Sequence, residues 1–219
     1  MFDKAIGRVL GRANQVIHNR AAQQLPDLVT DLVDNALVLW AGNNWHTFDH
    51  LESNCSVQLY RWLQEAKRTD MRFFPLSVNI ENIEFTPRML AGTESIVGAS
   101  RPDRRIHVGE SGVLLEAKRL TATARHCRAY VDEGMARFVT SAYAAAEDWG
   151  VMIGYVQEPT TVGLEPRVNK YVNAHTLMGA GHELVAAKST NAHSERWQSS
   201  HARSAGLPIR LDHVWVVLP

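Results

Sequence analysis

The sequence has little cysteine, no excess of charge of either sign and no long apolar run. Its two cysteines, Cys55 and Cys127, form no CxxC pair, which argues against a disulfide framework and predicts two reduced core thiols. Lysine plus arginine and aspartate plus glutamate number 23 each, so net charge gives no argument for a nucleic-acid partner. No stretch reaches membrane-spanning length, and the charged N-terminus lacks the apolar run of a signal peptide. We therefore expect a soluble, cytoplasmic protein without membrane association.

The length and apolar content of the chain suit one large domain. With 219 residues and 45% hydrophobic content, a sizeable core can form. We predict a single domain over 1–219, with an N-terminal helical segment at 1–44, a core at 45–156 and a helix and strands at 157–219 that complete it. Apolar periodicity predicts the following elements. Helices are expected at 1–40, 49–67, 121–147 and 165–178, strands within 71–85, 101–120, 151–156, 182–188 and 208–218, and a polar connection at 191–204.

Two Val-, Ile- and Leu-rich runs between residues 101 and 120 are joined by the sequence Gly-Glu-Ser-Gly, which predicts a β-hairpin. With Glu110 and Ser111 in the turn, Arg105 lies opposite Glu116 and Asp103 lies opposite Lys118. Alternate residues of a strand share a face, so the hairpin has one polar and one apolar face. The polar face carries Asp103, Arg105, His107, Glu116 and Lys118, and the apolar face carries Ile106, Val108, Val113, Leu115 and Ala117.

The polar face of this hairpin can bind a metal ion. Asp103 and Glu116 are diagonal neighbours, roughly 7–8 Å apart at the backbone, so their carboxylates can converge. Two carboxylates beside a lysine form an oxygen-rich site for Mg²⁺, with Mn²⁺ as an alternative. Lys118 would orient or deprotonate a water molecule, or neutralise a phosphate under attack. The alternative interpretation is a surface hairpin with ion pairs between Asp103 and Lys118 and between Arg105 and Glu116.

Glu52 and the elements after the hairpin bear on whether the polar face of the hairpin is a metal site. Asp49 and Glu52 have the spacing of a helix capping box, which is one interpretation of Glu52. In the other interpretation, Glu52 is an acid that points from its helix toward the metal site. The strand that contains Lys118, the following long helix and the apolar run at 151–156 predict a right-handed crossover between two parallel strands.

This order of elements resembles the PD-(D/E)XK, or restriction-endonuclease-like, nuclease superfamily over about residues 45–156. The resemblance rests on a helix with an acid, strands, Pro102-Asp103, twelve intervening residues, Glu116-Ala117-Lys118, a helix and a further strand. It implies an α/β (α+β) fold in which helices flank a mixed central sheet. It also implies that Asp103, Glu116 and the carbonyl of Ala117 bind Mg²⁺, that Lys118 positions the attacking water, and that Glu52 assists. His126 and Tyr130 have the spacing of the family's Gln-x-x-x-Tyr motif, with His in place of Gln.

Local charge favours a nucleic-acid partner where net charge does not. Basic residues flank the acidic centre on both sides, which suits a polyanionic backbone that crosses the site, although a solvated helix end would look the same. We predict a metal-dependent DNA endonuclease of the kind that serves restriction or anti-phage systems, which acts as a homodimer or within a larger defence complex. The alternatives are a nuclease for RNA and a non-catalytic binding or scaffold subunit. The predicted nucleic-acid contacts are Arg101, Arg105, Arg119, Arg125 and Arg128.

Overall fold

The strands of the protein form one mixed sheet. A computed structural model describes residues 23–80, 87–93, 95, 104–109, 111–141, 144, 147–189, 191–203 and 206–219. Within these ranges, seven strands pair in the order β1-β2-β3-β4-β7-β6-β5. The neighbours β3–β4 and β4–β7 are parallel, and the other pairs are antiparallel. The strands are β1 (Ser77–Ile80), β2 (Arg104–Val108), β3 (Ser111–Leu120), β4 (Trp149–Val156), β5 (Val185–Ala187), β6 (Glu195–His201) and β7 (Ile209–Val217).

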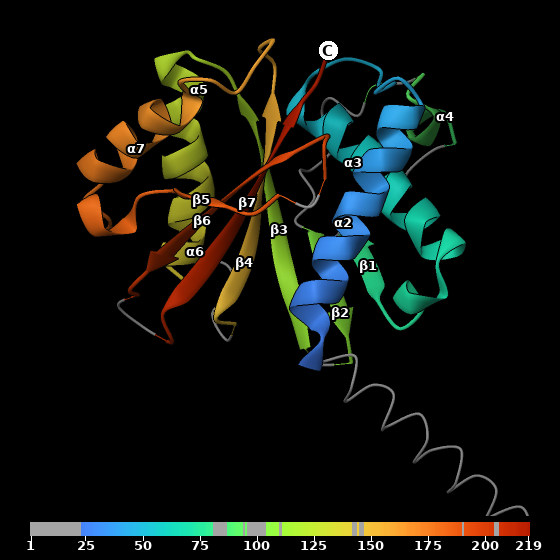
Figure 1. Ribbon diagram of the computed structural model, residues 1–219, viewed down its shortest axis with the longest axis horizontal. Coiled ribbons are helices and arrows are strands. Elements are labelled where there is room, and N and C mark those ends of the chain that lie inside the picture. Colours follow the sequence, from blue (N-terminus) through green and yellow to red (C-terminus); the bar gives the residue numbers. More distant parts are fainter. Residues whose placement is uncertain are drawn as a thin grey trace, which may run out of the picture.

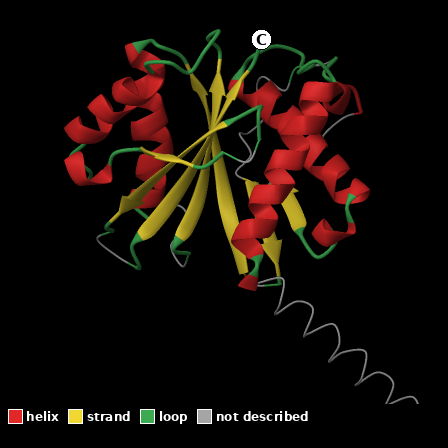
Figure 2. Ribbon diagram, in the orientation of Figure 1, coloured by secondary structure: helices red, strands yellow, loops and turns green. Residues whose placement is uncertain are grey.

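Helices cover both faces of this sheet (Figures 1 and 2). The predicted mixed sheet with flanking helices is therefore confirmed, as is the parallel pairing of β3 with β4. No helix in the described ranges is long and apolar enough to cross a membrane.

The helices α2 (Leu25–Gly42) and α3 (Glu52–Thr69) cover one face. Pro26 stands in the first turn of α2, where its missing N–H is tolerated. Most of the apolar stripe predicted for α3 is buried, and its side chains pack with those of β3 and β4. The stripe comprises Cys55, Leu59, Trp62, Leu63 and Ala66, whereas Leu51 precedes the helix and is partly exposed. Two short helical elements follow, η1 (Met71–Phe73) and α4 (Pro87–Ala91).

The opposite face is covered by a helical run and a separate helix. The run consists of α5 (Ala124–Ala129), a π-helical turn η2 (Tyr130–Met135) and α6 (Ala136–Val139), and the separate helix is α7 (Leu164–Ala174), which precedes η3 (Ala180–His182). The helix predicted at 121–147 therefore ends at Val139. Gly150, which lies between the predicted helix at 121–147 and the predicted strand at 151–156, belongs to β4. A Cβ at Gly150 would stand 2.6 Å from the ring of Phe138, so the glycine is explained by helix packing and not by a helix end.

The predicted hairpin forms with a different register. Arg104 pairs with Leu115 and Val108 pairs with Ser111, so the turn begins at Gly109, whose φ of 56° suits glycine. Arg105 therefore lies opposite Leu114, and its predicted pairing with Glu116 is wrong. The shift is by two residues, so the predicted division into a polar and an apolar face holds. The predicted pairing of Asp103 lies outside the described residues.

Two further regions bear on the strand predictions. The region 71–85, in which we expected strand structure, contains the strand β1 among its described residues. The polar connection predicted at 191–204 is wrong, because β6 runs through it between β5 and β7. The inward side chains Ser199 and His201 are buried although they are polar, and a hydrogen bond of 2.7 Å joins the Ser199 hydroxyl to Nε2 of His201. A pattern based on hydrophobicity does not detect such a strand.

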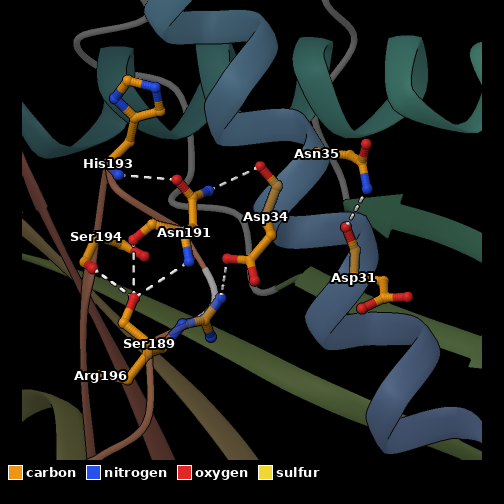
Figure 3. A network of polar contacts seen from close by, with 8 residues as sticks. All are labelled: Asp31, Asp34, Asn35, Ser189, Asn191, His193, Ser194 and Arg196. Atoms are coloured by element: carbon orange, nitrogen blue, oxygen red, sulfur yellow. Dashed lines mark hydrogen bonds and ion pairs between the residues drawn. The ribbon is translucent and has the colours of Figure 1, made fainter.

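A polar joint ties α2 to the segment between β5 and β6 (Figure 3). The guanidinium of Arg196 on β6 forms an ion pair with Asp34 on α2. The side chain of Asn191 donates to the Asp34 carbonyl at 2.9 Å and accepts from the His193 amide at 2.8 Å. The Ser189 hydroxyl lies 2.8 Å from the Ser194 carbonyl. We call these contacts the α2–β6 joint.

Candidate active site

A buried lysine lies between two carboxylates at one end of β3. The Nζ atom of Lys118 is 2.6 Å from Oε1 of Glu116 and 3.2 Å from Oε1 of Glu52. The side chains of Lys118 and Glu116 are only 4% and 6% exposed. Removing three charged groups from water is costly, and their mutual pairing offsets that cost. The sequence prediction that Glu116 and Lys118 share a face is confirmed, since they are two residues apart on one strand.

Glu52 reaches the site from the first turn of α3. The N-cap residue of this helix is Leu51, which makes no side-chain cap bond, and Asp49 lies before it and accepts from the Leu51 amide and the Asn54 side chain. The capping-box interpretation of Glu52 is therefore wrong. The Glu52 carboxylate instead accepts hydrogen bonds from the Lys118 ammonium and from the Arg119 amide at 3.1 Å. An acid on one helix is thus brought to a lysine 66 residues later in the chain.

The backbone of β3 faces Glu52 because β3 extends beyond its pairing with β2. In the described residues, that pairing reaches only Leu115, whereas β3 continues to Leu120. On the β4 side, the Leu120 carbonyl accepts from the Gln157 amide. Successive residues of a strand direct their N–H and C=O groups to opposite sides, so the carbonyl of Ala117 points to the same side as the Arg119 amide. That side is the one from which Glu52 approaches.

The lysine stem passes under the π-helical turn of the opposite helical layer. A Cβ at Gly134 in η2 would stand 3.3 Å from Cγ of Lys118 and 2.6 Å from Cε of Met152. Glycine therefore allows the close approach of η2 to β3. Sequence reasoning missed Gly134, and the only signal was a glycine inside a helical pattern.

Arg137 adds a second cation to Glu116. Its Nη1 atom lies 3.1 Å from Oε1 of Glu116, and its side chain is 38% exposed. Glu116 is thus held by the ammonium of a buried lysine and by the guanidinium of a residue that reaches solvent. Sequence reasoning did not select Arg137, because its place on the helical run depends on the π-helical turn before it.

The donors at this site have the chemistry that Mg²⁺ prefers. Two carboxylates and the Ala117 carbonyl supply oxygen atoms, and Mg²⁺ keeps several waters in its octahedron. Within the described part of the chain, no group of three or more His, Cys, Asp or Glu side chains is arranged to hold a metal ion. Asp103, the third predicted carboxylate, immediately precedes β2 in the sequence and lies outside the described residues. The described residues therefore fit part of a Mg²⁺ coordination shell.

The arginines that we predicted to contact nucleic acid differ in exposure and in their partners. Arg101 lies outside the described residues. Arg105 forms an ion pair of 2.9 Å with Glu147. Arg119 is half-buried beside the site, and Arg125 is exposed. Arg128 is exposed and lies over the ring of Tyr171 at 5.4 Å.

The structure also describes the surroundings of Arg104 and His126. Arg104, one of the basic residues that flank the acidic centre in the sequence, is 1% exposed and therefore does not lie at the surface. Burial, together with the nearby charges of Arg119 and Arg125, lowers the pKa of His126, whereas Glu52 raises it. The imidazole of His126 is hydrogen-bonded through Nδ1 to the Thr121 hydroxyl at 2.8 Å.

Tyr130 belongs to a buried network and not to the site. Its hydroxyl lies 2.9 Å from Nδ1 of His213 and accepts from Nε1 of Trp215 at 3.1 Å. Burial raises the pKa of Tyr130 and lowers the pKa of His213 to about 3. His213 is also hydrogen-bonded to the Ser199 hydroxyl at 2.8 Å, and this hydroxyl is hydrogen-bonded to His201. Tyr130, which has the spacing of the family's motif, is therefore a core residue in this fold.

Comparison with protein-family models, with curated proteins and with solved structures finds no match to this chain. The choice of function therefore depends on the geometry of the site. That geometry consists of a buried lysine, two carboxylates from different elements and an exposed arginine.

Proposed function

We propose that the protein is a metal-dependent nuclease that hydrolyses phosphodiester bonds of DNA in the manner of the PD-(D/E)XK superfamily. The observation that supports this most is the position of Lys118 between Glu116 on its own strand and Glu52 on α3. The order of α3, the strands β1 to β3, the helical run and β4 agrees with the order that the resemblance implies.

In this proposal, Asp103, Glu116 and the Ala117 carbonyl would hold Mg²⁺, with Mn²⁺ as a substitute. When bound, the ion would supply charge neutralisation at the phosphate and acidify a water molecule. Lys118, held between two carboxylates, acts as a hydrogen-bond donor that orients the water or the phosphate. The water oxygen forms a bond to phosphorus, the bond from phosphorus to the leaving oxygen breaks, and the leaving oxygen takes up a proton.

The other residues have supporting roles. Glu52 fixes the Lys118 ammonium and the backbone of Arg119, so that both face the substrate. Arg119 and Arg125 would contact the phosphates beside the scissile bond, together with Arg101 and Arg128. Arg105 would do so only after leaving Glu147. We further propose a cytoplasmic enzyme of a restriction or anti-phage system, in which a homodimer supplies one site for each strand.

Incubation of the purified protein with plasmid and with single-stranded DNA tests this function. We expect cleavage with Mg²⁺ or Mn²⁺, none with EDTA, and none by the Lys118→Met variant, which keeps the length of the stem. Lys170→Met, on the exposed surface of α7, is the matched control and should cleave normally. A protein that retards DNA without cleaving it in either metal would be a binding or scaffold subunit, and the proposal would fail. RNA assayed in parallel decides between the two nucleic acids.

A further inference from the structure

A pocket of about 570 Å³ opens where two parallel strands of the sheet end. In open α/β sheets, ligands bind in the crevice outside the carboxyl ends of the strands. Gln157 directly follows β4, Leu218 directly follows β7, and the Leu218 amide donates to the Val156 carbonyl at 2.9 Å. The volume lies within the range of roughly 300–1,000 Å³ that small-molecule pockets occupy. The lining residues are Trp45, His50, Gln157, Glu158, Pro159, Val217, Leu218 and Pro219.

Three segments connect this pocket to the candidate active site. His50 stands two residues before Glu52. The amide of Gln157 donates to the Leu120 carbonyl at 3.0 Å, at the end of the strand that carries Lys118. The carboxylate of Glu158 accepts from the Ala122 amide at 2.9 Å. Leu120 is two strand residues beyond Lys118, a distance of about 7 Å along the strand.

The aromatic wall of the pocket is held by an unusual backbone. Asn44 and Trp45 both have positive φ, 52° and 53°, although neither is glycine. Such conformations are costly for these residues and persist where the surroundings impose them, often at binding sites. The ring of Trp45 packs edge-on against Trp40 at 5.4 Å and against His193 at 5.8 Å. The ring is therefore fixed in place before any ligand arrives.

The pocket combines this ring with apolar and polar walls. Val217, Leu218 and two prolines provide apolar surface, and His50, Gln157 and Glu158 provide polar groups. The Gln157 side-chain amide donates to the His50 carbonyl, and its carbonyl oxygen is an acceptor that can bind a donor of a ligand. A flat heterocycle with donors and acceptors along one edge fits these walls. Nucleobases are such heterocycles, and they stack on aromatic side chains.

We propose that this pocket binds one unpaired nucleobase of the nucleic-acid strand whose phosphate lies at Lys118. The inference rests on the proposed function, because it names the form of the substrate. A base in this pocket would be next to the scissile phosphate, so the preferred substrate is a single strand or a duplex from which one base is extruded.

Fluorescence of 2-aminopurine tests the inference without cleavage. An oligonucleotide with one 2-aminopurine is titrated with the full chain in EDTA, as a single strand and as a fully paired duplex. Fluorescence anisotropy gives the affinity, and quenching reports stacking of the base. We expect quenching at a single position of the strand, and about 10-fold weaker binding by Trp45→Leu. Quenching in the duplex as well would mean that the protein extrudes the base.

A second variant and a control keep the test decisive. His50→Ala removes an exposed side chain of the pocket and should weaken quenching even if Trp45→Leu does not fold. Phe74→Ala removes an aromatic ring that is 80% exposed on another part of the surface and should change nothing. Binding without quenching at any position of the strand or duplex would overturn the inference. Quenching by a protein that cleaves no nucleic acid would overturn the proposed function and leave the base pocket intact.

Discussion

Two polar clusters join a helix of the same layer to a strand of the sheet, and they do so differently. At the α2–β6 joint, one carboxylate and one guanidinium are surrounded by bonds between side chains and backbone, so Asp34, Asn191 and Ser189 fix the course of a loop. At the candidate active site, four charged side chains meet, and the Arg119 amide is the backbone donor.

The difference indicates what each cluster is for. At the joint, each hydrogen bond to the backbone helps to fix the conformation of the loop and so contributes to stability. A cluster of two carboxylates, a lysine and an arginine pays a desolvation cost and presents mutually dependent charges, which is typical of sites that act on charged ligands. We therefore expect substitutions at the joint to change stability and substitutions at the site to change activity.

Exchanging the two acids for their amides tests this comparison most directly. We expect Glu52→Gln to lower kcat/KM for DNA by about 100-fold, because Lys118 loses a charged partner that orients it. We expect Asp34→Asn to leave kcat/KM unchanged. Cleavage assays with Mg²⁺ on both variants measure the contrast. Equal losses of activity in the two variants would show that the clusters do not differ in kind.

Breaking the ion pair of the joint should have the larger effect on folding. The side chains of Arg196 and Asp34 are 9% and 13% exposed, so Arg196→Leu takes the guanidinium away from a carboxylate that is largely shielded from water. We expect the free energy of unfolding to fall by about 3–5 kcal/mol, measured by urea denaturation. Arg72→Ala, which removes exposed ion pairs with Asp31 and Asp70, is the control and should cost much less stability than Arg196→Leu. Adding Asp34→Leu to Arg196→Leu should restore part of the loss.

Apolar periodicity explains which elements the sequence revealed. α3, β3 and β4 each bury a regular stripe or a continuous apolar run, and all three were predicted. β6 was missed because its inward residues Ser199 and His201 are polar, and they are hydrogen-bonded to each other within the fold. The hairpin register was wrong by two residues, because local sequence did not distinguish a turn that begins at Gly109 from one that begins a residue later.

The candidate site was accessible to sequence reasoning only in part. Glu116 and Lys118 stand two apart on one strand, so their shared face follows from strand geometry. Glu52 had two interpretations, and only the fold separates them, since the choice depends on how α3 meets β3. Arg137 and Gly134 could not be predicted, because the π-helical turn changes the phase of the helix that carries them.

A third polar cluster, which carries no charge, consists of Tyr130, Ser199, His201 and His213. It tests whether a buried network of uncharged side chains contributes to stability. Burial lowers the pKa of His213 to about 3 and that of His201 to about 4, the latter also because His182 and His175 are near. Both values lie below the ordinary value of about 6.5, so protons bind the unfolded chain first as the pH falls. Stability should therefore be complete above pH 6.5 and be lost between about pH 6.5 and 3.

Urea denaturation at several pH values measures this loss. Below pH 6 the slope should approach 1.4 kcal/mol per pH unit for each of the two histidines. His201→Phe removes one of them and should lower the slope accordingly. A stability that stays constant from pH 7 to pH 4.5 would contradict the burial of neutral histidines in this network.

The smallest effect is expected where the helical layer touches the site. Gly134→Ala adds a methyl group that would stand 2.6 Å from Cε of Met152 and 3.3 Å from Cγ of Lys118. Overpacking lowers the free energy of unfolding by roughly 1–3 kcal/mol. Replacing glycine by alanine in a helix raises it by up to about 1 kcal/mol, so the net change in stability should be small. The methionine can move, but a shift of the Lys118 stem displaces its ammonium from Glu52, and kcat should fall several-fold.

Gly150→Ala is the matched control for that substitution. Its Cβ would stand 2.6 Å from the ring of Phe138, without contact to Lys118. A ring in a packed core cannot yield as the end of a methionine can, so this variant should lose stability and keep its kcat. Thermal unfolding and Mg²⁺-dependent cleavage of both variants give the comparison. If Gly134→Ala keeps full activity while it unfolds at a lower temperature, the close approach of η2 to Lys118 serves packing and not the position of the ammonium.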